Sequence, residues 1–343
     1  MNIETISRNT NATDPLVSIV VVTYNASKYV LETLESAKAQ TYMNIELIIS
    51  DDSSKDDTVE ICRNWVEENK SRFVRVQLIT SEINTGIPGN CNRGYRAAEG
   101  AWIKGIGGDD ILMNRCIELN MGHVEEGCKV LFSNMQTFIV ENGERKLLNI
   151  LPKNDDLKFF ELNAHDQYSF FLDKSFLIAP TGFIERDVFI KVGGFDERFI
   201  CFEDLPFYLA LTKSGYKFSH FNQITVLYRK GEGVTSQNKT LLHPKLRRSV
   251  LDFERIILFK AIPWYNISFF VGYFYNLIDY YLAFYLFKNK RSRFAFFVLN
   301  FVKHTNPVRI LQSSYFRLLK VFLFIKEAIL SRFKFSINQI ISK

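Results

Sequence analysis

The chain has 343 residues, 47% of them hydrophobic, which suffices for one large domain or two ordinary ones with a sizeable core. Its five cysteines show no C-x-x-C spacing, so the composition argues against a zinc or disulfide framework and favours reduced thiols in a cytoplasmic protein. The net charge of +6 is uneven, because 14 Lys and Arg but only four Asp and Glu follow Val250, and the earlier part is net negative.

Apolar runs and helical spacing alternate along the first part of the chain. Residues 1–15 are polar and lack the pattern of a signal peptide, so we expect a leader. Helical spacing then predicts helices, with Ser27 as the N-cap of the first, at 27–40, 58–70 and 91–100. Apolar runs predict buried strands at 16–25, 45–50, 74–80 and 101–107. This alternation predicts a mainly parallel α/β sheet.

Later elements are less regular. The pattern is weak between about Glu141 and Asp173 and then predicts two helices, at 186–194 and 205–215, the second with Gly215 as its C′ residue. In a parallel sheet, ligands bind beyond the carboxyl ends of the strands. The polar clusters "TYN", "DDSS", "NTG" and "GGDD" follow the four predicted strands in turn. We therefore expect these clusters to meet at one edge of the sheet.

The stretch "GIGGDDILM" contains the tandem carboxylates Asp109 and Asp110. Such a pair can hold a divalent cation, which cancels the repulsion between the two acids and the charge of a diphosphate. Gly107 and Gly108 would let a ligand approach the backbone. A solvated turn is the alternative interpretation, and the position at a strand end favours the ligand site.

Other polar clusters allow two interpretations each. Asp52 can accept a hydrogen bond from a base or ribose, whereas the Asp56–Thr58 stretch is suited to helix capping. Tyr24 can stack on a base or be a buried ring with a satisfied hydroxyl. Glu203 and Asp204 begin a predicted helix, where carboxylates are stabilised by the helix N-terminus, and one of them can also serve as a general base.

The order of these motifs, from "VSIVVVTYN" through "SDDSSKDDT", "NTGIPGNCNRGY" and "GGDDI" to "VGGFDERF" and "FEDLPFYLALTKSGYKF", closely resembles glycosyltransferase family 2. Members of this family are inverting enzymes of the GT-A fold, a Rossmann-like α/β architecture, and they use nucleotide sugars. The resemblance covers about residues 17–229. Each motif alone is weak, but six in the right order are specific.

The resemblance implies a role for each matching residue. Asp204 matches the catalytic base, and Glu203 is its usual neighbour. Asp109 and Asp110 match the metal and diphosphate motif, with Asp110 as the direct ligand of Mn²⁺ or Mg²⁺. The residues that match nucleotide-binding positions, in addition to Asp109, are Tyr24, Asn25, Asp52, Gly86, Asn92 and Arg93.

The chain also departs from the family pattern. Gly108 stands where the first acid of a D-x-D motif is common, which puts the coordination number of the cation in doubt. No histidine follows the Tyr228–Arg229 pair, although many members carry one there. Cys91 stands where the family commonly has the alanine of "ARN".

These observations predict a metal-dependent inverting glycosyltransferase at residues 16–245. It would move a sugar, from a UDP-sugar, to a hydroxyl of a glycan or lipid-linked acceptor in surface polysaccharide synthesis. Two alternatives stay open at this stage: a polyprenyl-phosphate sugar transferase, and a non-catalytic nucleotide-sugar-binding or scaffold protein.

Residues 246–343 form a basic region with 24 of the 50 aromatic residues after Val250, which predicts helices that associate with a membrane. Trp264–Phe287 is long enough to span a bilayer but contains Asp279, and a basic amphipathic helix is expected within 309–334. We expect monotopic attachment to the inner face of the plasma membrane. A true span, a lid on the catalytic domain and a dimer interface are the alternatives. Nucleic-acid binding is disfavoured because the aromatic residues lie in apolar runs.

Overall fold

The computed structural model describes residues 6–7, 14–176, 178–231 and 240–307. Internal contacts divide the chain into two units, one made of residues 1–237 and 243–261 and the other of 238–242 and 262–343. The segment 246–261, which we expected in the C-terminal region, thus belongs to the first unit. Helix α9 (Pro244–Phe253) is held there because Phe253 packs edge-on against Phe199 and Phe202.

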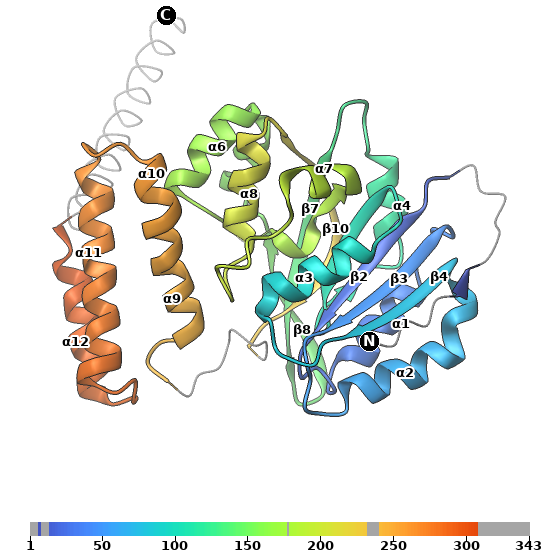
Figure 1. Cartoon of the computed structure of the whole chain (residues 1–343), viewed down its shortest axis with the longest axis horizontal. Helices are drawn as coiled ribbons and strands as arrows, with labels where there is room; N and C mark the ends of the chain where they lie inside the picture. Colours follow the sequence, from blue (N-terminus) through green and yellow to red (C-terminus); the bar gives the residue numbers. More distant parts are fainter. Residues whose placement is uncertain (1–5, 8–13, 177, 232–239, 308–343) are drawn as a thin grey trace, which may run out of the picture. The chain divides into compact units, whose positions relative to one another are not determined.

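A twisted, mainly parallel sheet forms the centre of the first unit (Figure 1). Strands β4, β3, β2 and β5 lie side by side in that order and run parallel. Their side chains are almost all buried, as expected for strands covered on both faces. The bounds are Val17–Thr23 for β2, Ile45–Asp51 for β3, Arg75–Thr80 for β4 and Trp102–Gly107 for β5.

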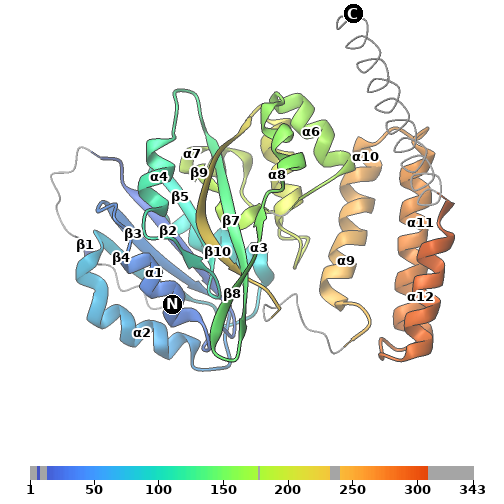
Figure 2. The same ribbon diagram turned by 180° about the vertical axis from the view of Figure 1, so that it is seen from behind.

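The sheet continues beyond β5 through β9, β7, β10 and β6, while β8 pairs with β7 as a hairpin and β1 (Ile6–Ser7) pairs with β4 (Figure 2). Strands β7 and β10 are parallel, and the other pairs in this half are antiparallel. The bounds are Ile111–Leu112 for β6, Val130–Glu141 for β7, Glu144–Leu151 for β8, Phe183–Glu185 for β9 and Phe218–Arg229 for β10.

Helices cover both faces of the parallel strands. Val30, Leu34 and Trp65 of α1 and α2 join one apolar cluster with alternate residues of β2 and β3. Helix α3 lies on the other face, because a Cβ added at Gly94 would lie 2.5 Å from the Val20 side chain. The bounds are Val30–Lys38 for α1, Thr58–Asn69 for α2, Gly86–Ala97 for α3, Cys116–Gly122 for α4, Asn154–Leu157 for α5, Ala164–Asp173 for α6, Arg186–Val192 for α7 and Asp204–Lys213 for α8.

Two helix starts differ from the sequence prediction. Helix α1 begins at Val30, so Ser27 is not its N-cap; the Ser27 backbone N–H donates instead to Asp56 at 3.1 Å. Helix α3 begins five residues before the expected Cys91, because the Asp52 carboxylate accepts the backbone N–H groups of Thr85 and Gly86. A carboxylate distant in sequence thus stabilises the free N–H groups of this helix.

The second unit consists of α11 (Ile267–Tyr281), a π-helical turn (Leu282–Leu286) and α12 (Arg293–Thr305) in the part that the structure describes. Helix α11 begins after Asn266, whose side chain accepts the Phe269 N–H. Among the described residues, none of the helices has the length and apolar character needed to span a membrane. The amphipathic helix expected within 309–334 lies outside the described residues.

Candidate functional site

A cavity of about 800 Å³ opens at the carboxyl ends of the parallel strands, within the first unit. Its size is that of a site for an extended small molecule. The four polar clusters that follow the parallel strands all reach it, as predicted, and residues within 200–204, 228–229 and 243–246 reach it as well. The predicted site residues that line it are Tyr24, Asn25, Asp52, Gly86, Asp109, Glu203 and Asp204.

The turn after β5 carries the paired carboxylates. Asp109 Oδ1 and Asp110 Oδ2 lie 2.9 and 3.6 Å from the position of an added Cβ at Gly107, so both oxygens converge on space that only glycine leaves open. A Cβ at Gly108 would lie 2.8 Å from Thr23 Cγ2. This close packing against β2 explains why the chain has glycine where an additional acid is common.

The electrostatics of this turn are unfavourable for two bare anions. Burial raises the pKa of Asp109, while the Arg229 charge opposes that rise. Burial and then the neighbouring Asp109 raise the pKa of Asp110 well above its usual range, against the effects of Arg229 and Lys104. A divalent cation between the two oxygens would remove both penalties, and carboxylate oxygen is the donor that Mg²⁺ and Mn²⁺ prefer.

The residues therefore fit a cation that takes its remaining ligands from a substrate and water. Within the described ranges, no group of three or more His, Cys, Asp and Glu side chains is arranged to hold a metal ion. Asp110 uses its Oδ1 to accept the Arg229 backbone N–H at 2.9 Å, which leaves Oδ2 directed toward the shared space. Two carboxylates alone suit a site completed by a diphosphate.

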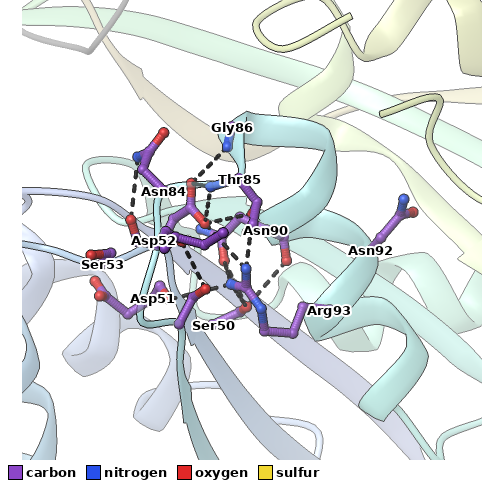
Figure 3. A network of polar contacts seen from close by, with 12 residues as sticks. Ser50, Asp51, Asp52, Ser53, Asn84, Thr85, Gly86, Asn90, Asn92 and Arg93 are labelled. Carbon is purple, nitrogen blue, oxygen red and sulfur yellow. Dashed lines mark hydrogen bonds and ion pairs between the residues drawn. The ribbon is translucent and has the colours of Figure 1, made fainter. Parts of the chain in front are cut away.

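Asp52 is the centre of a hydrogen-bond network at the edge of the cavity (Figure 3). Its carboxylate accepts the Thr85 N–H at 3.0 Å, the Thr85 hydroxyl at 2.6 Å, the Gly86 N–H at 2.9 Å and Arg93 Nη2 at 3.1 Å. These donors occupy the acceptor capacity of a carboxylate. In this structure Asp52 organises the "NTG" loop, and direct contact with a base stays a prediction.

Arg93 and Asn92 lie side by side in α3 but face different neighbours. Arg93 turns into the Asp52 network, where Nη1 also donates to Asn90 Oδ1 at 2.9 Å. Asn92 points away from it in Figure 3 and binds both backbone groups of Phe195, at 2.8 and 2.9 Å. Neither residue lines the cavity. The structure thus does not bring Asn92 together with the other predicted residues.

Tyr24 and Asn25 follow β2 and line the cavity. Asn25 adopts a positive φ of 50°, which asparagine tolerates. Its Oδ1 accepts the Lys55 N–H and its own N–H donates to Ser54, each at 2.8 Å. Asn25 therefore joins the "TYN" and "DDSS" clusters, which brings the first two strand ends together.

Glu203 and Asp204 lie at the start of α8 and line the cavity. Burial raises the pKa of Asp204 to about 6, and a hydrogen bond from Glu203 limits the rise. Burial and the Asp204 charge raise the pKa of Glu203 well above its usual range. The two carboxyl groups therefore titrate as a coupled pair, and Asp204, which accepts the hydrogen bond from Glu203, is the candidate proton acceptor.

Sequence reasoning missed several residues that line the cavity, among them Lys28, Arg229 and Lys245. The sequence analysis assigned no role to Tyr228 or Arg229 and used the pair only to locate a missing histidine. Lys245 reaches the cavity from α9, which lies outside the motifs that carry the resemblance. Each of these side chains is cationic, so they offset part of the carboxylate charge around the cavity.

The chain is similar in sequence to several named glycosyltransferases. The chain is 29% identical over 224 residues to the UDP-Glc:alpha-D-GlcNAc-diphosphoundecaprenol beta-1,3-glucosyltransferase WfaP of Escherichia coli, covering 65% of this chain and 81% of WfaP. It is 25% identical over 228 residues to the amylovoran biosynthesis glycosyltransferase AmsB of Erwinia amylovora, covering 65% of this chain and 72% of AmsB.

Among solved structures, S. aureus TarS 1-349 in complex with UDP-GlcNAc is similar over 77% of this chain and 81% of that chain, with a TM-score of 0.53 and 18% identity. A longer TarS structure is 44% covered, with a TM-score of 0.52. These similarities show the fold. The model of Glycosyl transferase family 2 matches residues 18–193. The chain belongs to this family, and it is a glycosyltransferase with a GT-A fold.

Proposed function

We propose that the chain is a metal-dependent inverting glycosyltransferase that transfers a sugar from a UDP-sugar to a hydroxyl of a glycan or lipid-linked glycan in surface polysaccharide synthesis. The observation that carries this proposal is that two carboxylate pairs meet at one cavity. Asp109, Glu203 and Asp204 line the cavity, and Asp110 Oδ2 faces the space at Gly107, which lines it too. Asp109 and Asp110 suit a cation and a diphosphate, and Glu203 and Asp204 suit proton transfer.

The names of related proteins support the choice of substrates. WfaP is named for a UDP-Glc donor and a diphosphoundecaprenol-linked acceptor, AmsB for amylovoran biosynthesis, and TarS 1-349 for its complex with UDP-GlcNAc. We extend the class of donor and the class of acceptor to this chain. Tyr24 at the end of β2 would stack on the base, and the loop held by Asp52 would close around the nucleoside.

Asp109 and Asp110 would hold Mn²⁺ or Mg²⁺ through the oxygens that face the space at Gly107. The cation would supply charge neutralisation for the departing diphosphate. Asp204 would accept the proton of the acceptor hydroxyl, whose oxygen attacks the anomeric carbon opposite the diphosphate. Displacement with inversion requires one base, and Asp204, which accepts a hydrogen bond from Glu203, would be that base.

Calorimetric titration of UDP, GDP and CMP, with and without Mn²⁺, tests this function. We expect UDP to bind and the other two nucleotides to bind much more weakly. Removal of Mn²⁺ is expected to abolish UDP binding, because two buried anions would then face the diphosphate. Tight UDP binding that is independent of a cation, or failure of all three nucleotides to bind, would contradict the proposal.

We further propose that the second unit attaches the enzyme to the inner face of an anionic membrane, where a lipid-linked acceptor is located. Trp264 is 84% exposed and Phe294 is 68% exposed, with further exposed rings on α11 and α12. Four basic residues lie between or at the start of these helices, at Lys288, Lys290, Arg291 and Arg293. Exposed rings beside basic residues match the interface of an anionic bilayer.

Flotation with lipid vesicles tests this attachment. We expect the full chain to float with phosphatidylglycerol vesicles and to float less with phosphatidylcholine vesicles. Replacement of Trp264 and Phe294 by Ser should reduce flotation with both, whereas R291E/R293E should remove the preference for the anionic lipid. Equal recovery of the wild type and both variants would contradict membrane attachment by this surface.

A further inference from the structure

Arg229 is the last residue of β10 and lies directly against the turn that carries Asp109 and Asp110. Its backbone N–H donates to Asp110 Oδ1 at 2.9 Å, and its Nε donates to the Asp109 carbonyl oxygen at 2.9 Å. One residue thus holds both members of the carboxylate pair. Because Oδ1 of Asp110 is occupied in this way, the orientation of its other oxygen depends on Arg229.

Arg229 is itself fixed from several directions. Its guanidinium lies 4.2 Å from the centre of the Tyr29 ring and 4.6 Å from that of Phe138, and its side chain is 4% exposed. Glu32 of α1 accepts its Nη2 and also pairs with Arg145 of β8. An arginine between two rings, with a carboxylate at its end, has little rotational freedom.

Helix α1 reaches the same turn through a second contact. The Thr33 hydroxyl donates to the Asp110 carbonyl oxygen at 2.7 Å. Glu32 and Thr33 are consecutive, so the first turn of α1 holds the carboxylate turn both directly and through Arg229. None of the described contacts of Glu32 is to Glu203 or Asp204. Replacement of Glu32 should therefore change the donor site without changing the general base.

We propose that Glu32 is a positioning residue for the donor site: by holding the Arg229 guanidinium, it keeps the Asp109–Asp110 turn in the geometry that receives a cation and a diphosphate. This inference rests on the proposed function of the turn. Residues that orient the ligands of a metal commonly change its affinity by about 10- to 100-fold when they are replaced. We expect a change of that size in the binding of Mn²⁺ and UDP.

The experiment compares E32Q, E32D and E35Q with the wild type by calorimetric titration of UDP in the presence of Mn²⁺. E35Q is a matched control, because Glu35 lies on the same helix and accepts Trp65 Nε1 rather than Arg229. E32Q should weaken binding by about 10- to 100-fold. E32D, which keeps the charge on a shorter side chain, should restore part of the affinity, and E35Q should bind as the wild type does.

Thermal unfolding of each variant accompanies the titrations. Should E32Q fail to fold, the double variant E32M/R229M replaces it, since no charge is then left buried alone; it is also expected to bind UDP with Mn²⁺ about 10- to 100-fold more weakly. Wild-type affinity in the folded E32Q or double variant would overturn the role of Glu32. If the wild type itself shows no Mn²⁺-dependent UDP binding, the proposed function fails, and the inference fails with it.

Discussion

Two buried carboxylate sites at opposite ends of the parallel strands, Glu46 and the Asp109–Asp110 turn, differ in how their charge is satisfied. At the amino ends, Glu46 is completely buried and accepts Arg75 Nη1 at 2.7 Å, together with the Glu99 and Gly100 N–H groups and the Ser18 hydroxyl. At the carboxyl ends, Asp110 lies beside a second acid, and burial and repulsion raise its pKa. The first arrangement satisfies its charges within the chain, and the second leaves a deficit of positive charge.

This difference separates stability from function within one sheet. The four donors to the Glu46 carboxylate offset the free-energy cost of removing it from water. Loss of one of these partners would leave buried charge uncompensated and would destabilise the fold. The buried Asp109–Asp110 pair lacks a full set of positive partners. It therefore lowers the stability of the fold but is suited to bind a cation. Variants at the two ends should therefore divide cleanly into those that unfold the protein and those that inactivate it.

The largest effect is expected from D204N. The amide cannot accept a proton, so kcat should fall by about 10²- to 10⁴-fold, the contribution typical of a general base. UDP binding should persist, since Asp204 does not take part in the cation site. The matched control D196N changes a half-buried acid of the preceding loop that pairs with Arg198, and it should leave kcat unchanged. Similar losses in both variants would exclude a specific role for Asp204.

Variants of the buried Glu46–Arg75 ion pair should lower the stability of the protein. E46Q leaves Arg75 without its buried carboxylate, and we expect the free energy of unfolding to fall by about 3–5 kcal/mol in urea denaturation. Glu99, whose side chain is 63% exposed and also pairs with Arg75, provides the control: E99Q should cost less than about 1 kcal/mol. The kcat of the folded fraction should be unchanged in both variants. A lower kcat in folded E46Q would contradict the claim that Glu46 affects only stability.

The pH dependence of kcat/KM should follow the ionisation of Asp204. Asp204 must be deprotonated to accept a proton, and burial raises its pKa to about 6. The value of kcat/KM should therefore rise with pH up to about 6 and fall about tenfold per unit below it. A profile that is flat between pH 5 and 7 would show that no base with this pKa limits the reaction.

The smallest effect is expected at Asn92. The sequence predicts that this residue binds the nucleotide, whereas in the structure its side chain binds the backbone of Phe195. In N92A both backbone groups of Phe195 lose their partner, so the free energy of unfolding should fall by about 1–3 kcal/mol. The Kd of UDP should not change. A weaker UDP complex at wild-type stability would restore the nucleotide-binding prediction for Asn92.

The sequence predicted the parallel strands and the edge where their polar clusters meet, because buried runs and strand order are local or follow from alternation. It did not predict the start of α3 at Gly86, since the stabilising carboxylate of Asp52 lies 34 residues earlier in the chain. The direction of Asn92 depends on a loop about 100 residues away. Strand β8 was missed because most of its side chains are exposed and lack an alternating pattern.

The central claim is that the Asp109–Asp110 pair and the Glu203–Asp204 pair have separate tasks, one in donor binding and one in chemistry. Calorimetric titration of UDP with Mn²⁺ on the wild type, D110N and D204N tests it most directly. We expect D110N to lose binding while its Tm stays equal or rises, because a neutral amide relieves a buried charge. D204N should bind as the wild type does. Loss of binding in D204N with retained Mn²⁺-dependent binding in D110N would contradict the claim.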